Sequence, residues 1–357
     1  MSFFSTKVKA LGAAAVFAFA ALATPALAAD PIPVRVSIFS WPGYAFWFVA
    51  QEKNLVPEID LDIKIIEDPY QSFGLVEADQ LDVVSSTAEY APFASAEGNS
   101  VRLVGYTNVS FGTDKIIVRP EIEGASDLKG ETVAVLEGGL SQIFVGIWLE
   151  NNGVTIDQVE FANLVMDDAT AAMLSGQVAG GEFWEPFGSA VLESLDGAKV
   201  VAQSAEPYWT KTGLLADAMY MRQGFIEDNP EAAMLAMKAY FAGVDYWREN
   251  TEEANKIMAD AIGFDVADIV SVIGDDGGPN KGGLVVYGAE DVGRFMGTYP
   301  GDPELGDLGQ HHGQIKDHFE LTATWWKKFG MIEDVPPFDG GVSLAPMTAL
   351  AKEMGGE

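Results

Sequence analysis

The sequence predicts an α/β protein with two lobes, each built on a mixed, mostly parallel sheet. Short apolar strands alternate with helical stretches along the chain, which is typical of α/β folds. The chain has 357 residues, and about 330 of them follow an export signal. This length suits two domains. Two segments between strands, described below, are places where the chain can pass between the lobes.

The N-terminus has the pattern of a signal peptide over residues 1–28. Lys7 and Lys9 precede an apolar run over residues 10–23, and Ala26-Leu27-Ala28 has the small-x-small form of a cleavage site. The alternative is a membrane anchor, but the run is short for a span. We therefore expect a mature chain from Ala29, in the periplasm.

Composition excludes several classes of partner. The chain has 53 acidic against 21 basic residues, which excludes nucleic acid because phosphate contacts need Lys and Arg. It has no cysteine, which excludes disulfides, thiolate chemistry and a lipid-attachment site. We expect a free monomer with a solvated acidic surface, as would suit a saline habitat. Surface charge is screened within about 10 Å, so it says little about a ligand.

The elements follow in order from the apolar patterns. A strand over 34–39 leads to a helix over 44–53, in which Tyr44, Trp47, Phe48 and Gln51 share helical spacing. A helix opens at Gly138 to Ser141, and another follows Asn229-Pro230, a capping residue before proline. That last helix should end near residue 247, with Met234, Met237, Phe241 and Val244 facing inward. The other predicted strands cover residues 61–65, 81–84, 101–104, 116–118, 133–136, 180–183, 200–201 and 214–221.

Two segments are predicted to connect the lobes. The first is the polar stretch from Tyr106 to Thr113, and the second is Leu215 to Tyr220. The first lobe would then comprise residues 29–108 and 219–357, and the second lobe residues 109–218 would be a continuous insert. The region after Pro300 is rich in Gly, Pro, Trp and His, and its pattern predicts less.

An ordered series of short motifs resembles one known family. The motifs are Ala50 to Leu55, Leu81 to Thr87, Asp127 to Gly130, Gly138 to Ser141, Ser175 to Val178, Phe183 to Pro186 and Asn229 to Glu231. In this order they resemble the substrate-binding proteins of ABC importers for taurine, alkanesulfonates and nitrate, whose relatives by fold include makers of a thiamine pyrimidine precursor. The resemblance implies a type II periplasmic-binding-protein fold with two crossovers, a ligand between closing lobes, and docking on a permease with its ATPase.

Candidate ligand contacts lie where strands end, since ligands of open α/β sheets sit at the carboxyl ends of strands. Ser40, Trp41 and Tyr44 follow the first strand. Ser85, Ser86 and Thr87 follow a buried strand and precede a helix, whose N-terminus could hold an anionic group. The alternative for these hydroxyls is simple helix capping.

Further candidates come from the insert and its borders. The candidates are Asn108, Ser110, Gly139, Ser141, Trp184 and Glu185. Asn108 and Ser110 could instead be polar groups of a hinge, and the glycine turn could be an ordinary strand-to-helix turn. Trp184 could stack on a ligand or cation, or belong to the core, and Glu185 could simply be solvated.

Asp217 is the most specific candidate, because a carboxylate in an apolar run is costly unless paired. The resemblance implies that it faces the amine of a taurine-like solute; the alternative is a paired structural residue. Only Lys115 and Arg222 are bases near the connections. Tyr70 would add a further aromatic wall. Such an aromatic and acidic cleft would suit an amine, a betaine-like cation or a heterocycle better than a sulfonate.

No motif predicts an enzyme, a cofactor or a metal site. His311, His312 and His318 lack zinc-binding spacing and are expected at the surface. Asp275 and Asp276 lack the spacing of a calcium loop, and no nucleophile elbow or phosphate-binding loop occurs. The alternatives to a transport protein are an exported enzyme and a periplasmic sensor on the same fold.

Overall fold

The structure is a computed structural model that describes residues 1–2, 30–277, 282–305 and 308–356. The predicted signal peptide therefore lies, apart from its first two residues, outside the described part of the chain. Residues 31–357 form one compact unit. Within the described residues, none of the helices combines the length and apolar character needed to cross a membrane.

The first sheet has six strands in the order β11-β4-β10-β3-β1-β2. Their bounds are β1 (Ile32–Ile38), β2 (Ile59–Ile65), β3 (Val83–Thr87), β4 (Val101–Ser110), β10 (Ala216–Arg222) and β11 (Leu284–Val286). β1 is parallel to β2 and β3, whereas β10 is antiparallel to β3 and β4. The sheet is mixed as predicted, but the expectation of mostly parallel pairing is wrong, because β10 and β11 enter it antiparallel.

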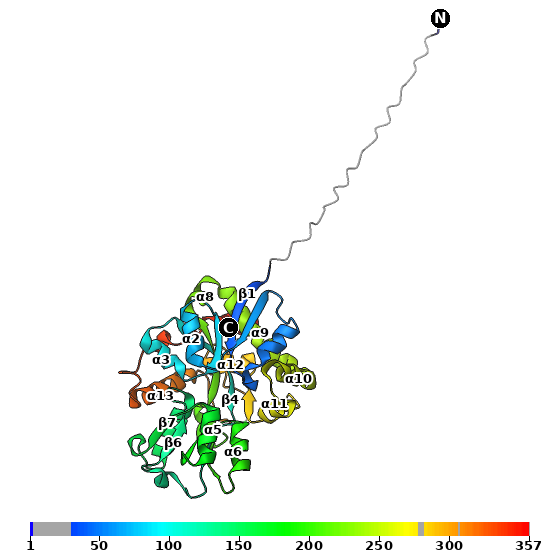
Figure 1. The fold of residues 1–357 in the computed structure, drawn as a ribbon. Coiled ribbons are helices and arrows are strands. Elements are labelled where there is room, and N and C mark those ends of the chain that lie inside the picture. Colours follow the sequence, from blue (N-terminus) through cyan, green and yellow to red (C-terminus); the bar gives the residue numbers. More distant parts are fainter. Residues whose placement is uncertain (3–29, 278–281, 306–307, 357) are drawn as a thin grey trace. The chain divides into compact units, whose positions relative to one another are not determined.

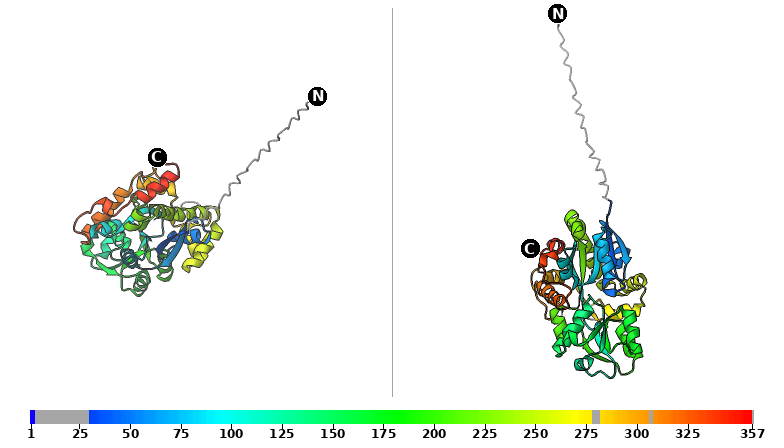
Figure 2. Two further views of the ribbon diagram at one scale, coloured as in Figure 1. Left: turned by 90° about the horizontal axis from the view of Figure 1, so that it is seen from above. Right: turned by 60° about the vertical axis from the view of Figure 1, so that its left-hand side comes forward.

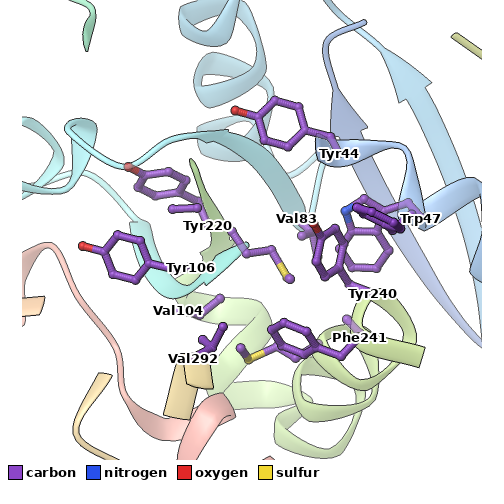
Figure 3. Close-up of a cluster of buried hydrophobic side chains, with 14 of the residues drawn as sticks. Tyr44, Trp47, Val83, Val104, Tyr106, Tyr220, Tyr240, Phe241 and Val292 are labelled. Carbon is purple, nitrogen blue, oxygen red and sulfur yellow. The ribbon is translucent and has the colours of Figure 1, made fainter. Parts of the chain in front are cut away.

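Helices cover this sheet and bury a large aromatic core. The helices are α1 (Phe46–Glu52), α2 (Pro69–Glu77), α3 (Tyr90–Glu97), α8 (Gln223–Asp228), α9 (Pro230–Glu249), α10 (Thr251–Ile262), α11 (Val266–Ile273), α12 (Ala289–Met296) and α14 (Ala345–Glu353). Helix α9 begins after Asn229 as predicted and buries Met237, Phe241 and Val244. Figure 3 shows Phe241 and Tyr240 of α9 beside Trp47 of α1 and Val104 of β4. This packing fixes the strand ends that face the cleft.

The second sheet has five strands in the order β7-β6-β8-β5-β9. They are β5 (Lys115–Val118), β6 (Thr132–Val135), β7 (Glu160–Asn163), β8 (Gly180–Phe183) and β9 (Lys199–Gln203). Helices α4 (Leu140–Asn151), α5 (Met166–Ser175) and α6 (Phe187–Ser194) belong to the same segment, which is green in Figure 1. This sheet is also mixed, since β5 is antiparallel to β8 and β6 is parallel to it.

Strand alternation explains why helices lie on both faces of the second sheet. Ile116 and Val118 of β5 point into the cluster that contains Phe144 of α4. Ile117, between them, points into a separate cluster with Met173 of α5. Successive side chains of a strand face opposite ways, so both faces are apolar and both are covered.

The first of the two connections between the sheets is shorter than predicted. Strand β4 runs to Ser110 within the first sheet, so the chain leaves it only at residues 111–114. It returns through residues 204–215, which contain α7 (Pro207–Thr212), and β10 begins at Ala216. The polar residues of the predicted first connection are therefore mostly strand residues at the sheet's end.

Helix α13 (Ile315–Lys328) packs on elements of both sheets. Trp325 and Trp326 join the cluster of the second sheet, whereas Phe319 and Ile315 join that of the first. The indole N–H of Trp326 donates to the carbonyl oxygen of Glu89 at 2.8 Å. Figure 2 shows this orange segment beside the green strands and helices. The predicted assignment of all residues 219–357 to the first lobe therefore misses this shared helix.

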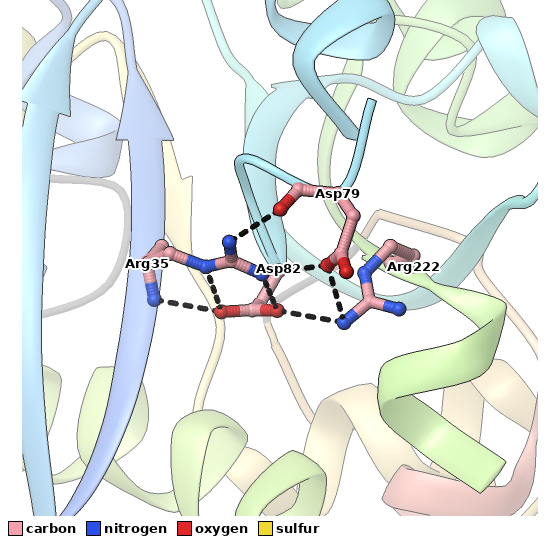
Figure 4. A network of polar contacts seen from close by, with 4 residues as sticks. All are labelled: Arg35, Asp79, Asp82 and Arg222. Atoms are coloured by element: carbon pink, nitrogen blue, oxygen red, sulfur yellow. Dashed lines mark hydrogen bonds and ion pairs between the residues drawn. The ribbon is translucent and has the colours of Figure 1, made fainter. Parts of the chain in front are cut away.

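An ion-pair network ties three strands of the first sheet at one end. Asp82 accepts from Arg35 of β1 at 2.7 Å and from Arg222 of β10 at 3.1 Å (Figure 4). Asp79 completes the network. Burial acts to raise the pKa of Asp82, but the two guanidinium groups lower it overall. Four short 3-10 helices complete the fold, at Pro42–Tyr44, Ala125–Leu128, Ile156–Gln158 and Phe338–Gly340.

Candidate binding cleft

A cavity of about 540 Å³ is lined by residues of both sheets and their connecting loops. Asp217 and Ser86 line it from the first sheet, and Glu182 lines it from the second. Ser141, near the start of α4, also lines it. A volume of this order is typical of small-molecule sites.

Asp217 is held by two neutral donors. The indole N–H of Trp41 donates to one carboxylate oxygen at 2.9 Å, and the hydroxyl of Tyr44 donates to the other at 2.8 Å. Asp217 is only 7 % exposed. Burial raises its pKa to about 7, although both hydrogen bonds act to lower it. The predicted pairing of this carboxylate is therefore present, but its partners do not neutralise its charge.

The turn after β1 places these two donors. Trp41 immediately precedes the 3-10 turn Pro42–Tyr44, and Tyr44, its last residue, is completely buried. A Cβ on Gly43 would lie 2.6 Å from Nδ2 of Asn108 and 2.9 Å from Nε1 of Trp41. The turn therefore requires glycine, because a larger residue would displace the groups around Asp217.

Two buried acceptors that line the cavity from the first sheet have no partner in the described structure. They are Oγ of Ser86 and Oδ1 of Asn108, and both residues line the cavity. Nδ2 of Asn108 donates to Thr107 at 3.1 Å. Buried polar atoms are nearly always hydrogen-bonded, so these atoms are available to a ligand. Ser110, in contrast, is engaged with Thr113 and Ser204 at 2.6 Å each.

Asp114 and Glu182 form an acidic pair beside the second sheet. Glu182 lies on β8 opposite Ile116, and Asp114 immediately precedes β5. Thr113 donates to Asp114 at 3.0 Å, whereas neither carboxylate oxygen of Glu182 accepts from an N–H or hydroxyl group, and its contact is with the carboxyl group of Asp114. Burial raises the pKa of both groups, and the neighbouring charge of Asp114 raises that of Glu182 further. The adjacent base, Lys115, is paired with Glu185 instead.

The start of α4 meets residues of the first sheet's helices. Tyr70 of α2 donates its hydroxyl to the carbonyl of Gly138 at 2.8 Å. Glu89, just before α3, is completely buried and accepts from Thr87 at 2.8 Å. Burial raises the pKa of Glu89 to about 8. The hydroxyl oxygen of Ser141 accepts from the backbone of Leu136 at 2.7 Å.

Most of the residues predicted from sequence lie at this cavity. Those lining it are Ser40, Trp41, Tyr44, Ser86, Thr87, Asn108, Ser110, Gly139, Ser141, Trp184 and Asp217. Ser85 is not among them: its hydroxyl accepts from the indole of Trp47 at 2.9 Å in the core. Glu185 is also absent from the lining and pairs with Lys115. Contact of any of these residues with a ligand remains a prediction.

The local setting of the serines differs from the expectation. Ser85, Ser86 and Thr87 lie within β3, and helix α3 begins only at Tyr90. They therefore do not form a helix N-terminus. Their cleft-facing groups are hydroxyls at the end of a strand that pairs with β10 beside Asp217.

Sequence reasoning missed the acidic residues of the second sheet. Glu182 has the same signal that identified Asp217, a carboxylate within a buried strand, here after Gly180 and Gly181. Glu67, Asp114 and Asp167 also line the cavity. They lie in polar stretches of an acidic chain, where their pattern does not separate them from surface residues.

The histidines divide between surface and core. His311 is exposed and pairs with Asp317 at 3.1 Å. His318 was expected at the surface but is buried, 3.2 Å from the carbonyl of Leu214. Burial lowers its pKa to about 4. The part of the chain that the structure describes contains no cluster of three His, Cys, Asp or Glu side chains placed to hold a metal ion.

Two mixed sheets that both line one aromatic-walled cavity define an α/β protein of the periplasmic-binding-protein fold. A family model described as NMT1/THI5 like matches residues 41–254. The chain belongs to this family.

Curated relatives carry several functional names. A putative binding protein of Brucella abortus is 25 % identical over 246 residues, which are 68 % of this chain and 75 % of the relative. A putative aliphatic sulfonates-binding protein of Bacillus subtilis is 25 % identical over 57 % of this chain and 60 % of its own length. A putative thiamine biosynthesis protein of Haemophilus influenzae is 27 % identical over 44 % and 51 %.

Solved structures confirm the fold. The periplasmic aliphatic sulphonate binding protein SsuA of Escherichia coli matches with a TM-score of 0.66 and 17 % identity, covering 88 % of this chain and 92 % of that one. The desulfurization enzyme DSZB also shares the fold, with a TM-score of 0.56 and 14 % identity over 90 % and 99 %. The fold therefore occurs in both binding proteins and an enzyme.

Proposed function

We propose that this chain is the periplasmic solute-binding component of an ABC importer, and that its solute carries a protonated amine or another cationic N–H donor. The supporting observation is the cavity's charge. Its lining includes the carboxyl groups of Glu67, Asp114, Asp167, Glu182 and Asp217, and no Lys, Arg or His among the described lining residues. A cation gains Coulomb energy there, whereas an anion meets repulsion in a site of low dielectric.

The aromatic walls favour the same class of solute. Trp41 and Trp184 line the cavity, and their rings can attract a cation through their π faces. The names of sulfonate-binding relatives suggest a solute such as taurine, whose amine would face Asp217. In that case the sulfonate would have to lie near the backbone N–H groups at the start of α4, since no base lines the cavity.

A second candidate solute is a protonated nitrogen heterocycle, such as a pyrimidine precursor of thiamine. The THI5-like family description and the name of the Haemophilus influenzae relative support it. Flat aromatic walls beside unpartnered acceptors at Ser86 and Asn108 would bind ring faces and ring N–H groups.

Export and delivery belong to the same proposal. The N-terminal sequence pattern supports passage to the periplasm, and the family resemblance supports a permease and ATPase as partners. We propose that the mature chain acts as a monomer and releases its solute unchanged. It has no cysteine, so a thiolate nucleophile is excluded.

A thermal-shift screen of the mature protein tests the solute class. The panel contains primary amines, betaines, taurine, alkanesulfonates, nitrate and aminopyrimidines. Ligand at 100 times its dissociation constant stabilises the folded state by about 2.7 kcal/mol, so true ligands raise the melting temperature. We expect cationic compounds to do so and simple sulfonates and nitrate not to. Stabilisation by anions alone would contradict the proposal, and mass spectrometry of the recovered solute would reveal any chemical change.

A further inference from the structure

Carboxyl groups line the cavity from both sheets. Asp217 lies on β10 of the first sheet, and the Asp114–Glu182 pair lies at β5 and β8 of the second. All three residues line the same cavity. The two acidic groups therefore face one ligand from opposite sheets.

The burial and hydrogen bonding of Glu182 are an independent observation that points to a ligand. Glu182 is 2 % exposed, and neither of its carboxylate oxygens accepts from an N–H or hydroxyl group of the described residues; its side chain instead contacts the carboxyl group of Asp114, with which it can share a proton. A buried carboxyl group without partners is destabilising, so such groups are rare unless something binds them. Its oxygens can accept up to four hydrogen bonds once ionised, and the cavity is where donors can arrive.

Among the described contacts, no basic side chain of the protein forms an ion pair with Glu182. Lys115 is the neighbouring cation, and its ammonium is paired with Glu185, whose second oxygen also accepts from the backbone of Ser189 at 3.1 Å. Asp114 is bonded by Thr113 and does not donate as a carboxylate. Among the described contacts no base of the protein is ion-paired with the Asp114–Glu182 pair, so a cationic N–H donor for this pair would come from the ligand.

Besides its carboxyl groups, the cavity lining is rich in aromatic side chains. Phe39, Trp184, Phe187 and Phe264 line it. A ligand that reaches carboxyl groups of both sheets would therefore gain from an apolar section between its polar ends.

We infer that the solute carries a cationic N–H donor at each end, one for Asp217 and one for the Asp114–Glu182 pair, so that its class is that of short α,ω-diamines. This inference rests on the proposed function and narrows it. An aminosulfonate has a cation at one end only, and its anionic end would face Glu182.

Calorimetric titration tests this inference with three kinds of probe. The first is a series of α,ω-diaminoalkanes of three to six carbons, the second is n-butylamine, and the third is taurine. We expect the best diamine to bind at least tenfold more tightly than n-butylamine. Glu182→Gln should weaken the diamine at least tenfold and leave n-butylamine nearly unchanged, whereas Asp217→Asn should weaken both.

A control variant on the same segment completes the test. Glu193→Gln removes an exposed carboxylate of α6 in the same segment and should leave diamine binding unchanged; melting curves verify that each variant is folded. Equal binding of n-butylamine and the diamines, or no effect of Glu182→Gln, would overturn the inference and leave the proposed function standing. Binding of taurine or aminopyrimidine but no diamine would also overturn it alone. Binding of simple sulfonates but no amine would overturn both.

Discussion

At the scale of single residues, Asp217 shows how a buried charge can be held without being neutralised. Trp41 and Tyr44 donate hydrogen bonds to both of its oxygens, and burial still raises its pKa to about 7. Such a carboxylate is oriented in advance and gains most from a cationic partner. We therefore expect Asp217 to determine both the affinity for the solute and the pH dependence of that affinity.

We predict that Asp217→Asn weakens binding of a cationic solute tenfold or more, about 1.4 kcal/mol, because a charge-assisted hydrogen bond is lost. Calorimetry at pH 8 measures the change, since Asp217 is then mostly ionised. The asparagine keeps one acceptor for Trp41 or Tyr44, so the melting temperature should change little. Unaltered affinity would remove Asp217 from the site.

We also predict that affinity for a cation rises between pH 6 and pH 8 as Asp217 loses its proton. The stability of the unliganded protein should change in the opposite direction. The folded-state pKa of Asp217 and Glu89, about 7 and about 8, exceeds the unfolded value near 4. The native state then binds more protons than the unfolded state. The contribution of these two groups to the free energy of unfolding is therefore complete below pH 4 and is lost as the pH rises through 7 to 8.

Urea unfolding at pH 5 and pH 8 measures this difference. Glu89→Gln, which cannot ionise, should reduce the loss of stability at pH 8 relative to the parent chain. A pH response that is the same in Asp217→Asn, Glu89→Gln and the parent chain would assign the effect to other groups.

At the scale of elements, the ion pairs at the end of β1, β3 and β10 hold the strands that carry the site. Asp82 is nearly buried and joins Arg35 to Arg222, whereas Asp79 is 70 % exposed at its side chain (Figure 4). We predict that Asp82→Asn destabilises the fold by about 1.5–3 kcal/mol, because charged hydrogen bonds to a part-buried group are lost. The matched Asp79→Asn should cost no more than about 1 kcal/mol, as for exposed ion pairs. Equal effects in denaturant unfolding would contradict this ranking.

The elements also show what the sequence can and cannot predict. Helix α9 and the turn before α4 were predicted well, because the Asn229-Pro230 start, the glycine turn and apolar spacing are local signals, although the side chain of Asn229 makes no capping hydrogen bond. The end of β4 was missed, since Asn108 and Ser110 are polar in sequence but paired with β10 and β11 in the sheet. Asp217 stood out against its apolar neighbours, whereas Asp114 did not, because its burial depends on contacts between distant segments.

At the scale of the whole molecule, two segments and one helix join the sheets. Residues 111–114 and 204–215 cross between them, and α13 packs on both through Phe319 and Trp326. We predict that Trp326→Ala destabilises the protein by about 3–5 kcal/mol through the cavity it leaves. It should also enlarge the radius of gyration of the unliganded protein in X-ray scattering. Trp326→Phe, which loses the bond to Glu89 and part of the buried ring but keeps an aromatic side chain, is the milder control.

The contact between Tyr70 and Gly138 gives this arrangement a functional meaning. A phenol of the first sheet's helices is bonded to the turn that starts α4, so this exchangeable bond couples the two sheets in addition to the connecting segments and α13. If a solute enters from water, the cavity would have to open, and opening would break the hydrogen bond between Tyr70 and Gly138. The rate of uptake would then depend on how often this bond breaks. Speed of capture and tightness of capture would accordingly depend on different residues, so that each could be tuned without altering the other.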